Sequence, residues 1–123
     1  MTEELHKSTL LITGSARGIG AATARLARAR GATVILHGRT ESAALRDLAE
    51  ELSSPWLAFD VSDATAVSTA MAVLLDEHDA IDGLVNNAGV TLQRTLLELA
   101  DDDWLDVFRT NLLGPVHLAR SIG

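Results

Sequence analysis

The sequence predicts an α/β fold in which parallel strands alternate with helices. Short apolar runs alternate with stretches of helical periodicity from the start of the chain, as in successive β-α-β units. The segment Thr13–Gly20, with the sequence TGSARGIG, supplies a glycine-rich turn between the first apolar run and the first helical stretch. The length of 123 residues suits one compact domain, which we expect to span residues 1–123.

The first strand is expected at Ser8 to Thr13 and the second at Thr33 to His37, because both are apolar runs of strand length. A helix is expected between them, from Gly18 to Arg30. Gly31 is placed to end this helix, since glycine readily adopts the conformation that closes one. The predicted buried face of the helix consists of Ile19, Ala22, Leu26 and Ala29.

A second helix is expected after Thr40, whose hydroxyl can accept a hydrogen bond from a free amide of the first turn, and Ser53–Pro55 should end it. The predicted apolar face of this helix consists of Leu45, Leu48, Ala49 and Leu52. A short third strand is expected at Trp56 to Phe59, where the next apolar run lies.

The third helix is expected after Ser62 or Asp63, either of which can cap it. Its predicted buried stripe consists of Val67, Ala70, Met71, Leu74 and Leu75. The fourth strand should be Leu84 to Asn87, followed by a loop or partial helix at Thr91 to Ala100. The acidic run Asp101–Asp103 favours the start of a last helix, because carboxylates stabilise a helix N-terminus, and this helix should run to about the final residue.

The glycine-rich segment suits the binding of a phosphate, because free amides at a helix N-terminus point toward negative charge. We expect Gly14 to form a tight turn, Gly18 to let the backbone approach a pyrophosphate, and Gly20 to let the helix pack closely on the strand. The spacing Gly-x3-Gly-x-Gly differs from the commonest dinucleotide fingerprint, so a simple turn remains the alternative. No Lys followed by Ser or Thr comes after the last glycine, which argues against a P-loop and nucleoside triphosphate hydrolysis.

The end of the second strand predicts which dinucleotide binds. A ribose 2′-hydroxyl is usually held by an acid at this place, whereas a 2′-phosphate requires a cation. The strand ends in His37-Gly38-Arg39 and offers no acid. Arg39 can hold a phosphate through two hydrogen bonds, and Arg17 is a second candidate. We therefore favour NADP(H) over NAD(H), and Glu41 is the residue that could reverse this preference.

The composition argues against several other classes. The formal net charge of -7 disfavours a nucleic-acid partner. The chain has no Cys and hence no disulfide or thiolate nucleophile. The first residues lack the basic region of a signal peptide, and no apolar run approaches the ~18 residues of a membrane span, so we expect a cytoplasmic protein with no membrane partner. The arginines between Gly14 and Arg46 either bind a small anion or form the solvent-exposed face of a helix.

Four motifs occur in order along the chain: TGSARGIG at Thr13–Gly20, then Asp60-Val61, then NNAG at Asn86–Gly89, and Asn111 in the last helix. Together they resemble the amino-terminal half of the short-chain dehydrogenase/reductase family. The resemblance implies a Rossmann-like doubly wound parallel sheet with strand order 3-2-1-4, truncated after the fourth strand and its helix. It also implies hydride transfer between a nicotinamide and a small carbonyl or alcohol substrate.

The resemblance assigns roles to individual residues. Asp60 would accept a hydrogen bond from the adenine amine and Val61 would pack against the ring, although Asp60 could instead only help to cap the third helix. The backbone of Asn87–Gly89 would lie against the nicotinamide-side ribose, and Asn86 would tie neighbouring strands together. The expected cofactor-binding residues are Gly14, Ser15, Arg17, Gly18, Ile19, Gly20, Arg39, Asp60, Val61, Asn87, Ala88 and Gly89.

Asn111 is the expected catalytic residue. The resemblance implies that its main-chain carbonyl holds a water in a proton relay to an active-site Lys. Pro115 follows four residues later and has no N–H to give that carbonyl, so Gly114-Pro115 predicts a kink at this point. A helix that simply bends around its core is the alternative.

The other residues that the resemblance calls for are missing from the sequence. The family reaction uses a Ser, a Tyr as general acid/base and a Lys, whereas this chain has no Tyr and its one Lys, Lys7, precedes the first strand. In the family these residues come after the stretch matched here. We therefore expect the chain alone to bind cofactor but to be inactive, with substrate bound only if the fold is completed. The scattered histidines, at positions 6, 37, 78 and 117, predict surface or packing roles and no metal site.

A sheet that stops at the fourth strand leaves one strand edge open, and the last helix also loses partners. We expect self-association through that helix or that edge. A non-catalytic nucleotide-binding or oligomerisation module is the alternative function. A phospho-receiver domain shares the layout but needs clustered acids after the first strand, where TGSARGIG has none.

Overall fold

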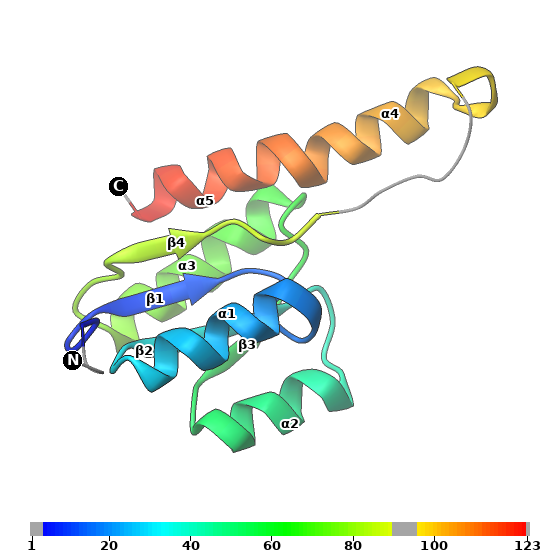
Figure 1. Cartoon of the computed structure of the whole chain (residues 1–123). Helices are drawn as coiled ribbons and strands as arrows, with labels where there is room; N and C mark the ends of the chain where they lie inside the picture. The colour runs from blue at the N-terminus through cyan, green and yellow to red at the C-terminus, as the bar shows by residue number, and fades with distance from the viewer. Residues whose placement is uncertain (1–3, 90–95, 123) are drawn as a thin grey trace.

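The computed structural model describes residues 4–89 and 96–122, which contain a four-stranded parallel sheet (Figure 1). The strands are β1 (Thr9–Ile12), β2 (Thr33–Gly38), β3 (Trp56–Ala58) and β4 (Gly83–Val85). Their order in the sheet is β3-β2-β1-β4, and each neighbouring pair is parallel. The predicted order 3-2-1-4 is therefore confirmed, as is the Rossmann-like fold class.

Helices cover both faces of the sheet. The helical elements in the described ranges are α1 (Gly18–Ala29), α2 (Ala43–Leu52), α3 (Ala64–Glu77), a 3₁₀ turn η1 (Leu96–Glu98), α4 (Asp101–Phe108), a π-helical segment η2 (Arg109–Leu113) and α5 (Gly114–Ile122). The side chains of α1 and α2 share one apolar cluster with the sheet, whereas α3 and α5 share the other. The three layers are visible in Figure 1, in which α4 extends beyond the sheet.

The alternation of side chains along the central strands creates these two clusters. Leu11 and Ile35 point to the side of α3 and α5, while Ile12 and Leu36 point to the side of α1 and α2. All four are completely buried. Because both faces of β1 and β2 are covered, these strands are continuous apolar runs, which is why they could be located in the sequence.

The predicted buried face of α1 is wrong. Ile19 and Leu26 are 79% and 57% exposed, and the helix instead buries its small residues, which are Gly20, Ala21, Ala24 and Ala27. A Cβ built on Gly20 would overlap the carbonyl oxygen of Gly14 and lie 2.9 Å from Ser15 Cα. The helix therefore approaches the sheet too closely for large side chains, and the larger apolar residues face outward.

The helix caps differ from prediction at one position. Ser42, not Thr40, caps α2, because its hydroxyl accepts from the amide of Leu45 at 3.1 Å. Asp63 caps α3 by accepting from the amide of Ala66 at 3.1 Å, as one of the two predicted alternatives. Gly31 ends α1 with a φ of +95°, as predicted.

The last helix is continuous from Asp101 to Ile122 and changes its hydrogen bonding midway. Around Asn111 it forms the π-helical η2, and the amide of Gly114 donates to the carbonyl of Arg109, five residues back. The irregularity lies directly before Pro115, where the sequence predicted a break in the regular pattern. A Cβ on Gly114 would lie 2.9 Å from Val61 Cγ2, so the glycine allows this helix to rest on the loop after β3.

The two halves of the last helix differ in burial. α5 buries Leu118 in the cluster with α3, whereas α4 buries none of its side chains. Trp104 and Phe108 are among its exposed apolar residues. Of the predicted segment from Thr91 to Ala100, residues 91–95 lie outside the described part, and the remainder includes η1. No helix in the described ranges combines the length and apolar character needed to cross a bilayer.

Candidate dinucleotide-binding site

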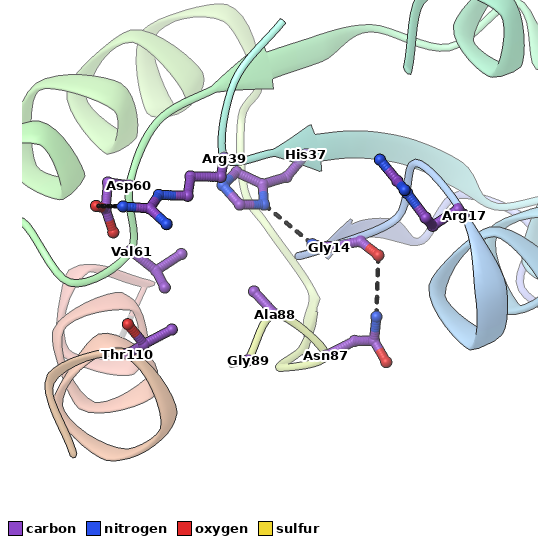
Figure 2. A pocket seen from close by; sticks show the side chains of 10 residues that line it. All are labelled: Gly14, Arg17, His37, Arg39, Asp60, Val61, Asn87, Ala88, Gly89 and Thr110. Carbon is purple, nitrogen blue, oxygen red and sulfur yellow. Dashed lines mark hydrogen bonds and ion pairs between the residues drawn. The ribbon is translucent and has the colours of Figure 1, made fainter. Parts of the chain in front are cut away.

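A pocket of about 310 Å³ lies at the carboxyl ends of the strands, the edge where ligands bind in sheets of this kind (Figure 2). It is lined by the turn after β1, the ends of β2 and β3, the loop after β4 and the segment η2. The lining residues are Gly14, Arg17, His37, Arg39, Asp60, Val61, Asn87, Ala88, Gly89 and Thr110.

Gly14 forms the centre of the turn after β1. Its φ of +63° lies in the left-handed region that favours glycine. Its amide donates to Nδ1 of His37 at 3.0 Å, and its carbonyl accepts from Nδ2 of Asn87 at 3.0 Å. Both bonds are drawn in Figure 2, with Gly14 between the two side chains. A Cβ on Gly14 would lie 3.0 Å from Ala88 Cα, so turn and loop are held in close contact.

The N-terminus of α1 has the properties of an anion site. The first amides of any helix lack partners within the helix. In α2 and α3 a side chain caps this end, whereas α1 has neither a side-chain cap nor an acidic residue in its first turn. Gly18 has a φ of +62°, and a Cβ built there would meet no atom within 4 Å. The open amides and the helix dipole therefore face space that a phosphate can occupy.

Thr13 fastens the loop after β4 to the end of β1. Its hydroxyl oxygen accepts from the amides of Asn87 and Ala88, each at 3.0 Å. The tie between strands that was expected of Asn86 is thus made by Asn87 and Thr13, while Asn86 itself is exposed.

Arg39 and Asp60 form an ion pair at the mouth of the pocket, with 3.4 Å between Nη2 and Oδ2. The other carboxylate oxygen of Asp60 accepts from the amide and the hydroxyl of Ser62, at 2.9 and 2.7 Å. Burial works to raise the pKa of Asp60, but the hydrogen bonds from Ser62 and the charge of Arg39 outweigh it and hold this pKa below its usual value. Asp60 is therefore an ionised acceptor beside Val61, which is buried in the pocket wall.

His37 was expected to have a surface or packing role; its ring is 1% exposed, packs on Phe59 and also lines the pocket. Its Nδ1 accepts from Gly14, and its Nε2 lies 2.7 Å from the carbonyl oxygen of Phe59. Burial lowers the pKa of this imidazole, with partial opposition from the Phe59 carbonyl and the charge of Asp60. The contacts join residues 22 or 23 positions apart, so no local pattern could have revealed them.

The remaining expected site residues lie around the pocket without lining it. Ser15 is fully buried, where its amide donates to the carbonyl of His37 and its hydroxyl oxygen accepts from the amide of His37, and Gly20 is a packing position. Gly18 and Ile19 are exposed at the N-terminus of α1. Asn111 lies beside the pocket, because a Cβ on Gly89 would be 3.1 Å from its Oδ1. Thr110, which the sequence did not indicate, faces the pocket next to it.

The other arginines of the first half have partners away from the pocket, and Arg28 donates to the backbone carbonyl of Leu52. Arg25 pairs with Glu51 at 2.8 Å on α1 and α2, and Arg46 pairs with Glu41 at 2.7 Å. Among the arginines in the described ranges, Arg17 and Arg39 are the two that line the pocket. The described residues contain no group of acidic, His or Cys side chains that could hold a metal ion.

The comparison with known proteins identifies the family. A family profile described as short chain dehydrogenase matches residues 8–122. The chain belongs to the short-chain dehydrogenase family. Among curated relatives of this family, the chain is 39% identical over 120 residues to a 3-oxoacyl-[acyl-carrier-protein] reductase, FabG, of Vibrio harveyi, covering 96% of the chain and 49% of that protein. It is 37% identical over 124 residues to the short-chain reductase NovJ of Streptomyces niveus, covering 96% of the chain and 47% of NovJ.

Solved structures of short-chain dehydrogenases share the fold. A citronellol catabolism dehydrogenase of Pseudomonas aeruginosa is 35% identical with a TM-score of 0.86, covering 95% of this chain and 49% of that one. A short-chain dehydrogenase of Streptomyces avermitilis is 32% identical with a TM-score of 0.87, covering 94% of this chain and 43% of that one. The chain thus spans about half the length of the relatives it matches.

Proposed function

We propose that this chain is the NADP(H)-binding half of a short-chain dehydrogenase. The observation that carries the proposal is the pairing of an uncapped helix N-terminus at α1 with two arginines, Arg17 and Arg39, that line one pocket. The open amides suit the pyrophosphate, and a guanidinium beside the ribose suits an additional phosphate.

The preference for NADP(H) over NAD(H) depends on the end of β2. Arg39 stands there with its side chain 71% exposed, and the pocket holds no acid on β2 that could accept from a ribose 2′-hydroxyl. An exposed ion pair such as that of Arg39 with Asp60 is worth little, so a doubly charged phosphate can displace the carboxylate at small cost. Glu41 pairs with Arg46 and does not line the pocket, which supports the same preference.

The rest of the pocket fits the two ends of a dinucleotide. Asp60 offers a carboxylate and Val61 an apolar surface, which suit an adenine amine and ring. At the other end, Gly89 leaves the backbone accessible beside Thr110 and Asn111. The nicotinamide, when bound, supplies the hydride. The residues of this chain bind and orient it, and the carbonyl of Asn111 is proposed to hold a relay water.

Hydride transfer needs more than this chain contains. The sequence has no Tyr to act as proton donor and no Lys near the pocket, so we propose that the 123 residues alone are inactive. The whole enzyme would interconvert a carbonyl and an alcohol. Because FabG is named a 3-oxoacyl reductase, a 3-oxoacyl thioester is the first substrate to test.

A second function, an oligomerisation module, is favoured by one observation. α4 and η2 expose Trp104, Phe108 and Leu112, which are 40%, 50% and 57% exposed. Contiguous exposed apolar side chains of this size mark association surfaces. We therefore propose that the chain associates with itself through this helix face, whether or not it binds cofactor.

Thermal unfolding of the chain with NADPH, NADP⁺ and NADH, each at the same concentration, tests the proposed function. A ligand that binds only the folded state raises the unfolding temperature. We expect the largest rise with NADPH and NADP⁺ and a smaller one with NADH. Absence of a rise with all three would overturn cofactor binding and leave the oligomerisation module, whereas oxidation of NADPH by the chain with a 3-oxoacyl thioester would overturn inactivity.

A further inference from the structure

The ring of His37 connects the two sides of the pocket. Its Nδ1 is 3.0 Å from the amide nitrogen of Gly14, in the turn before α1, and its Nε2 is 2.7 Å from the carbonyl oxygen of Phe59, directly before Asp60. The ring also packs on the ring of Phe59, with 4.4 Å between centroids and an interplanar angle of 59°. One buried side chain thus contacts both the phosphate turn and the wall expected to hold adenine.

The two partners fix the protonation state of this ring. The amide of Gly14 can only donate, so Nδ1 must be an unprotonated acceptor. The carbonyl of Phe59 can only accept, so Nε2 must carry the proton. The structure therefore assigns the neutral Nε2–H tautomer to His37. A protonated ring would direct an N–H at the N–H of Gly14.

The backbone of His37 holds the next residue of the turn in a different way. Its amide donates to Ser15 Oγ at 2.9 Å, and its carbonyl accepts from the amide of Ser15 at 2.9 Å. These bonds do not depend on the residue type at position 37. The orientation of the Gly14 amide does depend on the residue at position 37, because the imidazole is the acceptor that turns this amide inward.

We infer that His37 is a positioning residue for the cofactor, whose neutral ring holds the Gly14 turn in the shape that leaves the amides of α1 open to the pyrophosphate. This inference rests on the proposed cofactor binding. Since acid converts the Nδ1 acceptor into a donor, cofactor affinity falls with acidification in a manner that depends on residue 37.

The charged groups around His37 have opposing effects. Arg17 from the turn, Arg39 from the end of β2 and Asp60 from the end of β3 are the other ionisable residues among those that line the pocket. Asp60 favours the charged imidazole, but burial is the larger influence and lowers the pKa of His37. The ring is therefore neutral at neutral pH, and the acidic range is where the contact with Gly14 is lost.

Measuring the Kd for NADPH at about pH 7.5 and about pH 5.5 in the wild-type chain and in His37→Asn tests the inference. The Asn side chain offers an acceptor near the position of Nδ1 and does not titrate. The 2′-phosphate of the ligand titrates near pH 6 itself, and the comparison removes this common contribution. We expect the wild type to lose more affinity than His37→Asn over this interval. Equal losses would overturn the inference.

Two further measurements keep the test independent of how well His37→Asn folds. Imidazole ¹⁵N spectra of the wild-type chain at neutral pH should show the Nε2–H tautomer for His37, and an Nδ1–H tautomer would contradict the inference. His37→Leu, which removes the acceptor, should bind NADPH more weakly than His37→Asn at the neutral pH. Wild-type chain that binds NADPH with the same pH profile as His37→Asn defeats only the role of His37, whereas wild-type chain that binds no NADPH defeats the proposed function as well.

Discussion

The backbone of Gly20 lies directly against the carbonyl oxygen of Gly14. A Cβ built at Gly20 would overlap that oxygen and would also lie 2.6 Å from Asn87 Nδ2, whereas a Cβ at Gly18 would meet nothing within 4 Å. The two positions of this motif therefore require glycine for different reasons. Gly20 provides space for helix packing, and Gly18 provides a left-handed conformation at φ +62°.

Gly20→Ala is expected to lower the free energy of unfolding by about 3 kcal/mol, because backbone atoms cannot move aside as a flexible side chain could. Gly18→Ala should cost only about 1 kcal/mol, the penalty of the left-handed conformation. Urea unfolding of both variants measures the difference. Equal stability of the two variants would contradict the packing role of Gly20.

Arg39→Ala should weaken NADPH binding by on the order of tenfold and leave NADH binding unchanged, because the charge-assisted contact to the 2′-phosphate is lost. Fluorescence titration with both cofactors measures the two Kd values. Arg46→Ala is the matched control, since Arg46 is also an exposed, ion-paired arginine but does not line the pocket. An equal change for NADPH and NADH would rule out recognition of the 2′-phosphate by Arg39.

Ser42→Ala is expected to destabilise the chain by about 1 kcal/mol, the usual cost of losing an N-cap, because the amide of Leu45 loses its acceptor. Thr40→Ala, the neighbouring hydroxyl that the sequence favoured, should have almost no effect. Thermal unfolding distinguishes the two. A larger loss in Thr40→Ala than in Ser42→Ala would mean that α2 begins earlier than the structure shows.

Acid should destabilise the wild-type chain through His37. Burial lowers the pKa of this ring in the folded chain, so below about pH 6.5 the unfolded chain binds a proton that the folded chain does not. The stability present at neutral pH is therefore lost as the pH falls from there toward the lowered pKa, by at most about 1.4 kcal/mol per pH unit. Asp60 has a lowered pKa too, and its contribution is lost only at more acidic pH.

Urea unfolding of the wild type and His37→Asn across this range separates the two residues. The stability of the wild type should fall more steeply than that of the variant between about pH 6.5 and pH 5. Parallel profiles would show that His37 does not carry the acid sensitivity.

The parallel sheet could be predicted because its central strands are apolar on both faces. Apolar runs such as Thr33–Gly38 show no pattern that competes with the prediction of a strand, and the helices between the strands have regular apolar periodicity. The buried face of α1 could not be read in the same way. The larger side chains of Ile19 and Leu26 dominate the periodicity, but the close packing of Gly20 on the turn selects the alanine face instead.

The site shows the same division between local and distant information. The glycine turn and Arg39 follow from local sequence, because a turn and a strand end are local features. The position of His37 depends on Gly14 and Phe59, which are brought to it only by strand pairing. Thr110 reaches the pocket because η2 passes over the loop after β4, an arrangement that helical periodicity alone does not predict.

The most direct test of the central claim is a two-dimensional ¹⁵N–¹H spectrum of the 123-residue chain during titration with NADPH. Amides at the N-terminus of α1, those of Gly18 and Ile19, should shift together with that of Gly89 as the ligand saturates. The amide of Glu77, at the far end of α3 and outside the pocket, should stay in place. A folded chain whose Gly18 and Gly89 signals do not move, or whose shifts gather around Glu77, would contradict the assignment of this edge as the cofactor site.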